Sequence, residues 1–285
     1  MCVMIHGLKD YKERNLEMAI FDKIFKKEGY LCLYEKETEI FEELDKDFLS
    51  FLDGYDVKKY NIPAMIDGEI LAKCNYYESF PQHLSLISTI KEERLGEVSS
   101  KKMVTFEDLQ MHNKVLTPAA CLHLYPMIEE LQPKENLNIT TRARVYRYEG
   151  NRYNEVGRLW DYTVREFVFV GESEYVREML RKMMDRTLAY AKEITPKAKL
   201  VSSSDMFFGC KRNEIKKKLQ LANEKKFEVI IPIDGEDVAV ASFNFHGNHF
   251  SMPFHFDQHG SIVSGCVGFG IERWVLAKLF YEERR

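Results

Sequence analysis

The sequence predicts an α+β fold, with helices packed on a mixed or antiparallel sheet. Strand-like segments in the middle of the chain follow one another through short loops, which favours such a sheet over a doubly wound parallel one. Other segments carry apolar residues at helical spacing. No internal repeat or low-complexity linker divides the 285 residues, so we expect one domain over 1–285, with a short helical N-terminal part, about 1–58, and an inserted basic helix, about 210–226.

Composition and charge narrow the function classes. Hydrophobic residues make up 45% of the chain and charged residues 30%, which is an ordinary composition for a globular protein. A net charge of −4 argues against a nucleic-acid binder that uses its whole surface. The first residues hold too short an apolar stretch for a signal peptide, and no run approaches the roughly 18 residues that suggest a membrane span. Six cysteines lie far apart, without a CxxC pair. We therefore expect a cytoplasmic protein without disulfides.

The first half of the chain predicts two helices followed by short extended segments. Helical spacing indicates a helix from Leu16 to Glu28, ended by Gly29, and a second helix over 40–52. NIPAMID, 61–67, is strand-like, and YYESFPQHLSLIS, 76–88, is a turn with a short apolar element. The segment 114–131 is interpreted as a strand that passes through a proline into a helix, with Cys121 near the start of that helix.

The segment Arg142–Glu166 predicts a strand, a charged loop and a returning strand, with five further arginines after Arg142. Alternation along the two strands would point one set of side chains to one face of the sheet: Val145, Arg147, Glu149, Tyr162, Val164 and Glu166. That face is a candidate phosphate-binding surface. The alternative is a solvated hairpin with paired surface charges.

The second half of the chain begins with a helix over 176–194. A lysine-rich segment, 211–226, carries an apolar stripe through Ile215, Leu219 and Ala222, which predicts an amphipathic helix with a basic outer face. The segments 227–234 and 238–250 follow as strands, and 261–280 starts as a strand and becomes a helix.

Two motifs carry the chemistry. GFGIERW, 268–274, is glycine-rich at a strand-to-helix junction, but it lacks the third glycine and the leading βαβ position of a dinucleotide-binding loop. Together with RYE, 147–149, it resembles motifs 2 and 3 of the class II aminoacyl-tRNA synthetases, which implies an antiparallel sheet flanked by helices. The resemblance also implies an ATP site in which Arg147 contacts the α-phosphate, Glu149 lies on the adenine side, Tyr162 stacks under adenine and Arg273 covers it.

A narrower resemblance concerns a metal. Cys121 in LTPAACLHLYP, Glu166 in TVREFVFVG and Cys266 in SGCVGFG resemble the zinc ligands of the archaeal-type seryl-tRNA synthetases. Two thiolates and one carboxylate leave one tetrahedral position open, as in a catalytic and not a closed structural site. The resemblance implies one Zn²⁺ per chain, which would bind the α-amino group of an amino acid.

The family that the whole chain resembles is that of the amino acid:[carrier protein] ligases, truncated homologues of those synthetases. The segments that carry this resemblance are LTPAAC, YYESFP, GRLWDYTVRE, SFNFHGNHF and CVGFGIERW. Only about 60 residues precede the NIPAMID segment, which resembles motif 1, so a large tRNA-binding domain is not expected and tRNA is an improbable partner. The resemblance implies that ATP, with Mg²⁺, activates a small amino acid such as glycine or alanine, which then passes to the phosphopantetheine thiol of a holo acyl carrier protein.

The same resemblance assigns further residues. Ser242 and Asn244 resemble amino-acid-pocket positions, although a core strand would use the same residues about as often. A basic helix in this part of the chain binds the carrier in the family, which corresponds here to Lys211, Arg212, Lys216, Lys217 and Lys218. The alternative for these residues is a solvated helix face. A homodimer is expected through motif 1.

Two rival functions stay open. The first is a minimal tRNA-charging enzyme of the seryl type whose RNA-binding domain lies on another chain. The second is a catalytically silent, synthetase-like regulator that only binds ATP, an amino acid or a partner. The presence of both motif arginines and all three metal positions argues against the regulator.

Overall fold

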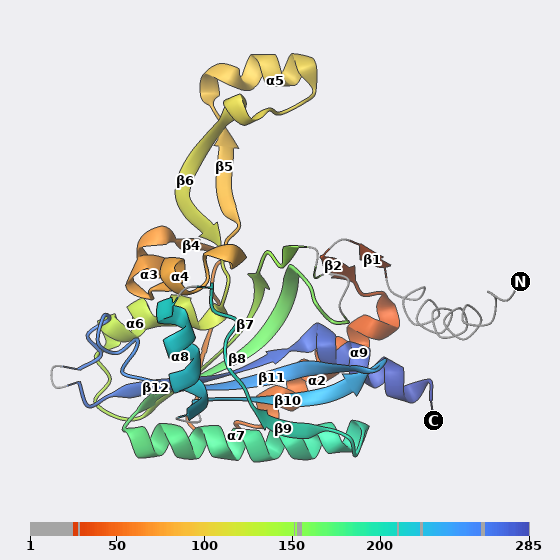
Figure 1. The fold of residues 1–285 in the computed structure, drawn as a ribbon, viewed down its shortest axis with the longest axis vertical. Helices are drawn as coiled ribbons and strands as arrows, with labels where there is room; N and C mark the ends of the chain where they lie inside the picture. The colour runs from red at the N-terminus through yellow and green to blue at the C-terminus, as the bar shows by residue number, and fades with distance from the viewer. Residues whose placement is uncertain are drawn as a thin grey trace, which may run out of the picture.

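The computed structural model describes residues 25–284, apart from 28, 151, 153–155, 210, 223–224 and 258–259. Its centre is a seven-stranded sheet in the order β3-β7-β8-β12-β11-β10-β9 (Figure 1). All neighbours are antiparallel except β3 and β7, which are parallel. The strands are β3 (Lys58–Tyr60), β7 (Leu137–Tyr146), β8 (Asp161–Gly171), β9 (Lys199–Ser202), β10 (Lys226–Ile233), β11 (Glu236–Gly247) and β12 (Val263–Gly270).

Three helices cover one face of this sheet: α2 (Glu35–Ser50), α7 (Ser173–Ile194) and α9 (Ile271–Glu282). Their apolar side chains and those of β8, β10, β11 and β12 form the main core. Phe48 of α2 stacks on Phe269 of β12, with ring centroids 4.5 Å apart, and Trp274 of α9 is fully buried beside them. Aromatic contacts of this kind stabilise a core beyond the area that they bury.

The other face carries smaller elements and a second core. These elements are α3 (Gly68–Lys73), α4 (Tyr76–Ser79), α6 (Leu124–Leu131) and the 3₁₀ helices η1 (Pro81–His83) and η4 (Ala120–His123). A loop that follows β9 leads into α8 (Lys211–Ala222). This face is therefore the one on which loops and short helices can bring polar groups together.

A three-stranded sheet, in the order β4-β6-β5, extends from this side of the molecule. Figure 1 shows the β5–β6 hairpin projecting away from the body, with α5 at its tip. The elements of this arm are β4 (Met65–Asp67), β5 (Leu86–Ile90), η2 (Glu92–Arg94), α5 (Leu95–Lys101), η3 (Phe106–Asp108) and β6 (Leu109–Leu116).

The predicted α+β class and the central hairpin are confirmed, as are the helix at 176–194 and the strand-to-helix passage at the C-terminal end. The predicted helix from Leu16 falls mostly outside the described residues. Its last part is wrong, because Phe25–Lys27 is a strand, β1, that pairs with β2 (Tyr30–Cys32). Gly29, with φ +81°, therefore belongs to a hairpin turn and not to a helix end.

The prediction for the basic helix needs two corrections. The helix ends at Ala222, and Lys226 instead opens β10 as a buried residue. Ile215 is 59% exposed, whereas Asn213 is buried and donates hydrogen bonds to the Phe208 and Glu78 carbonyls. The helix is therefore anchored by a polar residue, and Ile215 and Ala222 of the predicted apolar stripe are exposed. Among the described residues, no helix is long and apolar enough to cross a membrane.

Candidate active site and metal centre

Strand register brings the predicted residues to one face of the sheet. Side chains of directly opposed residues share a face. Glu166 of β8 lies opposite Thr141 of β7 and Gly268 of β12. Gly268 in turn lies opposite Ser242, and Cys266 lies opposite Asn244. The same face continues to β10, because Lys226 pairs with Asn244 and Glu228 pairs with Ser242. This is the face away from the three long helices.

Cys121, Glu166 and Cys266 meet on this face. Their ligand atoms all lie within 4.8 Å of one another, and each residue is at most 6% exposed. Cys121 comes from the first turn of η4 and the other two come from adjacent strands. Burial raises the pKa of Glu166 to about 7, and the neighbouring Cys121 and burial raise the pKa of the Cys266 thiol well above its usual range. Three buried anions would repel one another, so the cluster needs a compensating cation to exist in its charged form.

The donor set fits zinc. Two thiols and one carboxylate are ligand types that Zn²⁺ takes, and three protein ligands leave a fourth position for another group. Asn244 donates from Nδ2 to the Cys266 sulfur, 3.6 Å away. A Cβ atom at Gly268 would lie 3.5 Å from Glu166 Oε2 and 3.6 Å from Ser242 Oγ. The predicted pocket residues Ser242 and Asn244 therefore border the cluster.

Arg147 lies beyond the end of β7, between this cluster and the predicted nucleotide residues. Its Nε donates to the Pro118 carbonyl at 2.7 Å, and its guanidinium carbon is 5.9 Å from the Tyr162 ring centroid. Burial lowers the pKa of Arg147, but Tyr162, Tyr76, Glu149 and Glu166 outweigh burial and raise it overall. The guanidinium is thus a fixed positive charge near both Tyr162 and the carboxylate of Glu166.

Arg273 lies in the first turn of α9, as predicted. Its guanidinium donates to the Gly157 carbonyl at 2.9 Å and to the Ala239 carbonyl at 2.6 Å. Gly157, with φ +65°, comes so close that a Cβ atom there would lie 3.2 Å from Arg273 Cγ. These contacts fix the direction of the side chain. Burial lowers the pKa of Arg273, and the nearby arginines Arg158 and Arg147 also lower it.

Glu149 has buried neighbours that the sequence did not predict in full. Its carboxylate is 7% exposed and lies 3.7 Å from Arg158 Nη1 and 3.8 Å from His83 Nδ1. His83 is buried, and its Nδ1 has no hydrogen-bond partner among the residues described. The His83 carbonyl accepts a hydrogen bond from the Tyr148 backbone N–H at 3.1 Å. In the sequence, His83 is marked only by the YYESFPQH segment. Its position next to Glu149 depends on tertiary packing.

A polar cluster next to Asn244 and Ser242 was also missed. Lys226 Nζ lies 2.6 Å from Asp205 Oδ1 and 3.2 Å from Glu228 Oε1. Asp205 and Gln220 of α8 exchange two hydrogen bonds, at 2.8 and 2.7 Å. Asp205 stands in a loop without any local motif, so no sequence signal marked it. The cluster ties the start of β10 to α8.

The predicted carrier-binding residues lie on α8, but they differ in their surroundings. Lys217 and Lys218 are exposed, whereas Lys216 is partly buried and donates to the Ser79 hydroxyl at 3.0 Å. The side chains of Lys211 and Arg212 lie outside the described part of the structure. Lys216 therefore anchors the helix, and Lys217 and Lys218 form its exposed basic surface.

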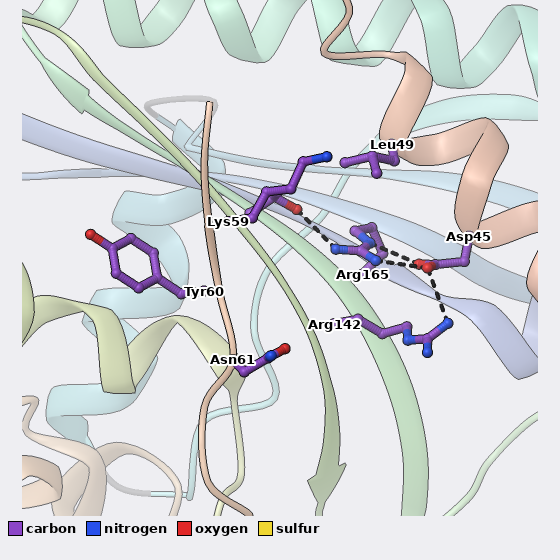
Figure 2. Close-up of a pocket in the computed structure, with 8 residues that line it drawn as sticks. Asp45, Leu49, Lys59, Tyr60, Asn61, Arg142 and Arg165 are labelled. Atoms are coloured by element: carbon purple, nitrogen blue, oxygen red, sulfur yellow. Dashed lines mark hydrogen bonds and ion pairs between the residues drawn. The ribbon is translucent and has the colours of Figure 1, made fainter. Parts of the chain in front are cut away.

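A separate pocket, of about 440 Å³, lies on the helix-covered side at the edge strand β3 (Figure 2). Arg165 makes two 2.7 Å hydrogen bonds to the Asp45 carboxylate, and Arg142 makes a third at 3.2 Å. Figure 2 shows both guanidinium groups directed at Asp45, with Tyr60 turned away from them. None of the predicted site residues lines this pocket.

Comparisons with known proteins agree with this architecture. No protein-family model matches the chain. Amino acid–[acyl-carrier-protein] ligase 1 of Bradyrhizobium diazoefficiens is 27% identical over 270 residues, which span 90% of this chain and 82% of that protein. The type-2 serine–tRNA ligase of Methanopyrus kandleri is 27% identical over 246 residues, 81% of this chain but only 44% of that enzyme.

Solved structures share the fold. M. kandleri SerRS, in complex with A. aeolicus tRNASec, superposes with a TM-score of 0.75 and 22% identity, covering 93% of this chain and 56% of that one. Giardia lamblia prolyl-tRNA synthetase, in complex with prolyl-adenylate, gives a TM-score of 0.67 at 11% identity over 94% of this chain and 52% of that one. The chain thus has the class II aminoacyl-tRNA synthetase fold, and its sequence relatives are the amino acid–[acyl-carrier-protein] ligases and the archaeal type-2 serine–tRNA ligases.

Proposed function

We propose that the chain is a single catalytic domain that activates a small amino acid with ATP and transfers it to the phosphopantetheine thiol of an acyl carrier protein. The observation that carries the proposal is the meeting, on one sheet face, of Arg147 with the Cys121–Glu166–Cys266 cluster. A site for a nucleotide phosphate and a site for an amine thereby adjoin. Relatives named amino acid–[acyl-carrier-protein] ligase, matched over most of their length, support the choice of acceptor.

In the first half-reaction a carboxylate oxygen of the amino acid attacks the α-phosphorus of ATP. A phosphorus–oxygen bond forms, the bond to the β-phosphate oxygen breaks, and pyrophosphate leaves. Such a step needs positioning and charge neutralisation more than proton transfer. Arg147 supplies a fixed positive charge for the phosphate oxygens, and Mg²⁺ bound with ATP would add to it. Tyr162 and Arg273 would hold the adenine between them, with Glu149 beside it.

Cys121, Glu166 and Cys266 would hold Zn²⁺, which supplies a Lewis-acid position for the neutral α-amino group of the substrate. Ser242 and Asn244 border this cluster and would line the amino-acid pocket. Their neighbours Lys226 and Glu228 take the next positions on the same face. The proposed substrate is a small amino acid such as glycine or alanine.

In the second half-reaction the thiol sulfur of the carrier attacks the carbonyl carbon of the aminoacyl-adenylate. A carbon–sulfur bond forms, the carbon–oxygen bond to the phosphate breaks, AMP leaves with the electron pair, and the thiol proton passes to solvent. No cysteine of the enzyme acts as the nucleophile. The exposed Lys217 and Lys218 on α8 would attract an acidic carrier and orient it.

We also propose a homodimer. Strand β3 forms one edge of the seven-stranded sheet, so its outer hydrogen-bonding edge has no strand partner within that sheet. The pocket between α2 and β3 lies at the same edge, with Arg142 and Arg165 directed at Asp45 (Figure 2). An open edge beside a polar pocket is a surface that proteins usually cover. Light scattering after gel filtration should give about twice the 33.6 kDa chain mass.

An acceptor assay tests the proposed function. The purified protein should catalyse amino-acid-dependent exchange of pyrophosphate into ATP, and radiolabelled glycine or alanine should then move to a holo carrier protein and not to bulk tRNA. An apo carrier, which lacks the thiol, is the control. Label on tRNA alone would favour the minimal synthetase. The type-2 serine–tRNA ligases among the relatives are the reason to test this alternative. If the protein showed neither pyrophosphate exchange nor transfer of label, the result would favour a silent regulator.

A further inference from the structure

The hydroxyl of Tyr125 is buried without a hydrogen-bond partner in the part of the chain that the structure describes. Tyr125 is 0% exposed, and its ring stacks on Phe250 with centroids 4.0 Å apart and an angle of 15°. Phe254 and Phe256 lie around the same ring. These contacts hold the side chain in one direction. A buried polar group without a partner is rare enough to need an explanation.

Tyr125 belongs to the same buried cluster of side chains as Cys121 and Cys266. It follows Cys121 by four residues, at the point where η4 continues into α6, so the two side chains lie about one helical turn apart. A phenol has an ordinary pKa of about 10 and is protonated near neutral pH. The phenol therefore keeps its proton and has one hydrogen to donate.

The sulfur of Cys266 already has a hydrogen-bond donor of the kind that Tyr125 would provide to Cys121. Asn244 Nδ2 donates to Cys266 Sγ at 3.6 Å, so Cys266 already has a polar partner on the sheet side. A neutral thiol is a weak acceptor, whereas a thiolate accepts charge-assisted hydrogen bonds. Tyr125 would thus gain its missing partner when Cys121 becomes a thiolate, as a metal ligand must.

We propose that the Tyr125 hydroxyl donates a hydrogen bond to the Cys121 thiolate when the cluster holds zinc, and so acts as a positioning residue for that ligand. The inference rests on the zinc site of the proposed function. The hydrogen bond fixes the direction of the sulfur and withdraws part of its charge. The metal then keeps more of its own charge for an incoming amine.

The test compares Tyr125→Phe with the wild type in metal binding. Tyr281→Phe is the matched control, because it removes a hydroxyl that donates to the Pro232 carbonyl at 2.7 Å, far along the chain from the cluster. Co²⁺ replaces zinc, and its affinity is measured by competition with a chelator while the sulfur-to-cobalt charge-transfer band is recorded. We expect Tyr125→Phe to bind about 10- to 100-fold more weakly. The band should move to longer wavelength, because the sulfur lone pairs rise in energy without the hydrogen bond.

The outcomes separate this inference from the proposed metal site. Wild-type protein that binds neither Co²⁺ nor Zn²⁺ overturns the site and the inference together. Wild-type binding with unchanged affinity in Tyr125→Phe overturns the role of the hydroxyl alone, and so does weaker binding with an unmoved band. Metal-free Tyr125→Phe should unfold in urea at the same concentration as the wild type or a higher one. A lower midpoint would mean a structural role and would also overturn the proposal.

Discussion

Alternation along β8 decides which of its side chains can reach the site. Glu166 points to Cys121 and Cys266, whereas Arg165 points to the helix layer and pairs with Asp45 of α2. A shift of the strand by one residue would exchange these two positions and bury an arginine beside the cysteines. The position of the carboxylate beside the cysteines therefore depends on the register of β8 with β7 and β12 as much as on the presence of glutamate at position 166.

The first prediction concerns metal content. Cys121→Ser should lose most of the bound zinc, about one per chain in the wild type, because an alcohol is a far weaker zinc ligand than a thiolate. Pyrophosphate exchange should fall with the metal. Metal analysis after dialysis checks this, with Cys32→Ser, an exposed cysteine, as the control. Exchange that persists in metal-free protein would remove zinc from the mechanism.

The second prediction uses the two faces of the hairpin. Arg147→Ala should lower the rate of pyrophosphate exchange by about 10²- to 10³-fold, since in the proposed function it removes the charge that faces the reacting phosphate. Arg144→Ala is the control, because Arg144 lies on the opposite face and pairs with Asp161 at 2.8 Å. Steady-state kinetics at saturating ATP should find its rate close to that of the wild type. Similar losses in both variants would point to general damage of the hairpin.

The third prediction concerns pH. Burial lowers the pKa of His83 to about 4 from an ordinary 6.5, and the positive charge of Arg147 acts in the same direction. The unfolded chain therefore takes up this proton first as the pH falls, so stability is lost below about pH 6.5. Each pH unit between about 6.5 and 4 should cost up to about 1.4 kcal/mol.

Urea unfolding measured near neutral pH and near pH 5 checks this. His83→Gln should flatten the loss of stability on acidification, because glutamine takes up no proton. An equally steep loss in wild type and variant would show that His83 is not the source, and that other buried histidines, such as His246 with a pKa lowered to about 3, account for it.

At the scale of elements, the proposed carrier-binding role of α8 depends on its exposed surface. Asn213, Lys216 and Gln220 tie it to the body through hydrogen bonds to the 78–79 segment, the Phe208 carbonyl and Asp205. The exposed Lys217 and Lys218 make none of these anchoring contacts. Binding of a carrier and adenylate formation can therefore be separated by mutation.

The fourth prediction makes that separation. The double variant Lys217→Glu, Lys218→Glu should lower kcat/KM for the carrier protein by about tenfold or more, because charge steers and orients the encounter. Pyrophosphate exchange should be unchanged. The control is Lys36→Glu, Lys46→Glu, with the same change of charge on the exposed side of α2. The difference between the two variants should shrink at high salt, and equal losses would remove α8 from the carrier site.

At the scale of the whole molecule, α2 is joined to the hairpin by a buried ion-pair network. Asp45, 7% exposed, takes two hydrogen bonds from Arg165 and a longer one from Arg142, while the exposed Glu42 also pairs with Arg142 at 2.8 Å. The network lies behind the strand that carries Glu166. It therefore couples the helix layer to the register of the site.

The fifth prediction compares the two acidic partners. Asp45→Ala should lower the free energy of unfolding by about 3 kcal/mol or more, since it leaves Arg165 as an unpaired buried charge. Glu42→Ala should cost less than about 1 kcal/mol, as expected of an exposed pair. Chemical denaturation measures both values. Losses of equal size would show that the network is not a buried one in solution.

The sequence by itself determined the fold class, most of the long elements and the identity of the motif residues. Alternation in 142–166 and the helical spacing of 176–194 are local patterns that survive in any context with one buried face. The metal triad was predicted through family resemblance, because residues 121, 166 and 266 carry no common local pattern. Their meeting within 4.8 Å follows from the antiparallel pairing of β8 with β12 and the placement of η4 over them.

Only the tertiary structure decided the rest of the site. His83 and Asp205 take their roles from neighbours far along the chain, and Tyr125 takes its proposed role from its burial beside the cluster; no local pattern encodes these contacts. The same reason explains the errors. Phe25–Lys27 became a strand because Tyr30–Cys32 pairs with it, and Lys226 left the basic helix because β11 and Asp205 pair with it. A short hairpin in the first place, and pairing with a more distant strand and with Asp205 in the second, outweighed local helix propensity.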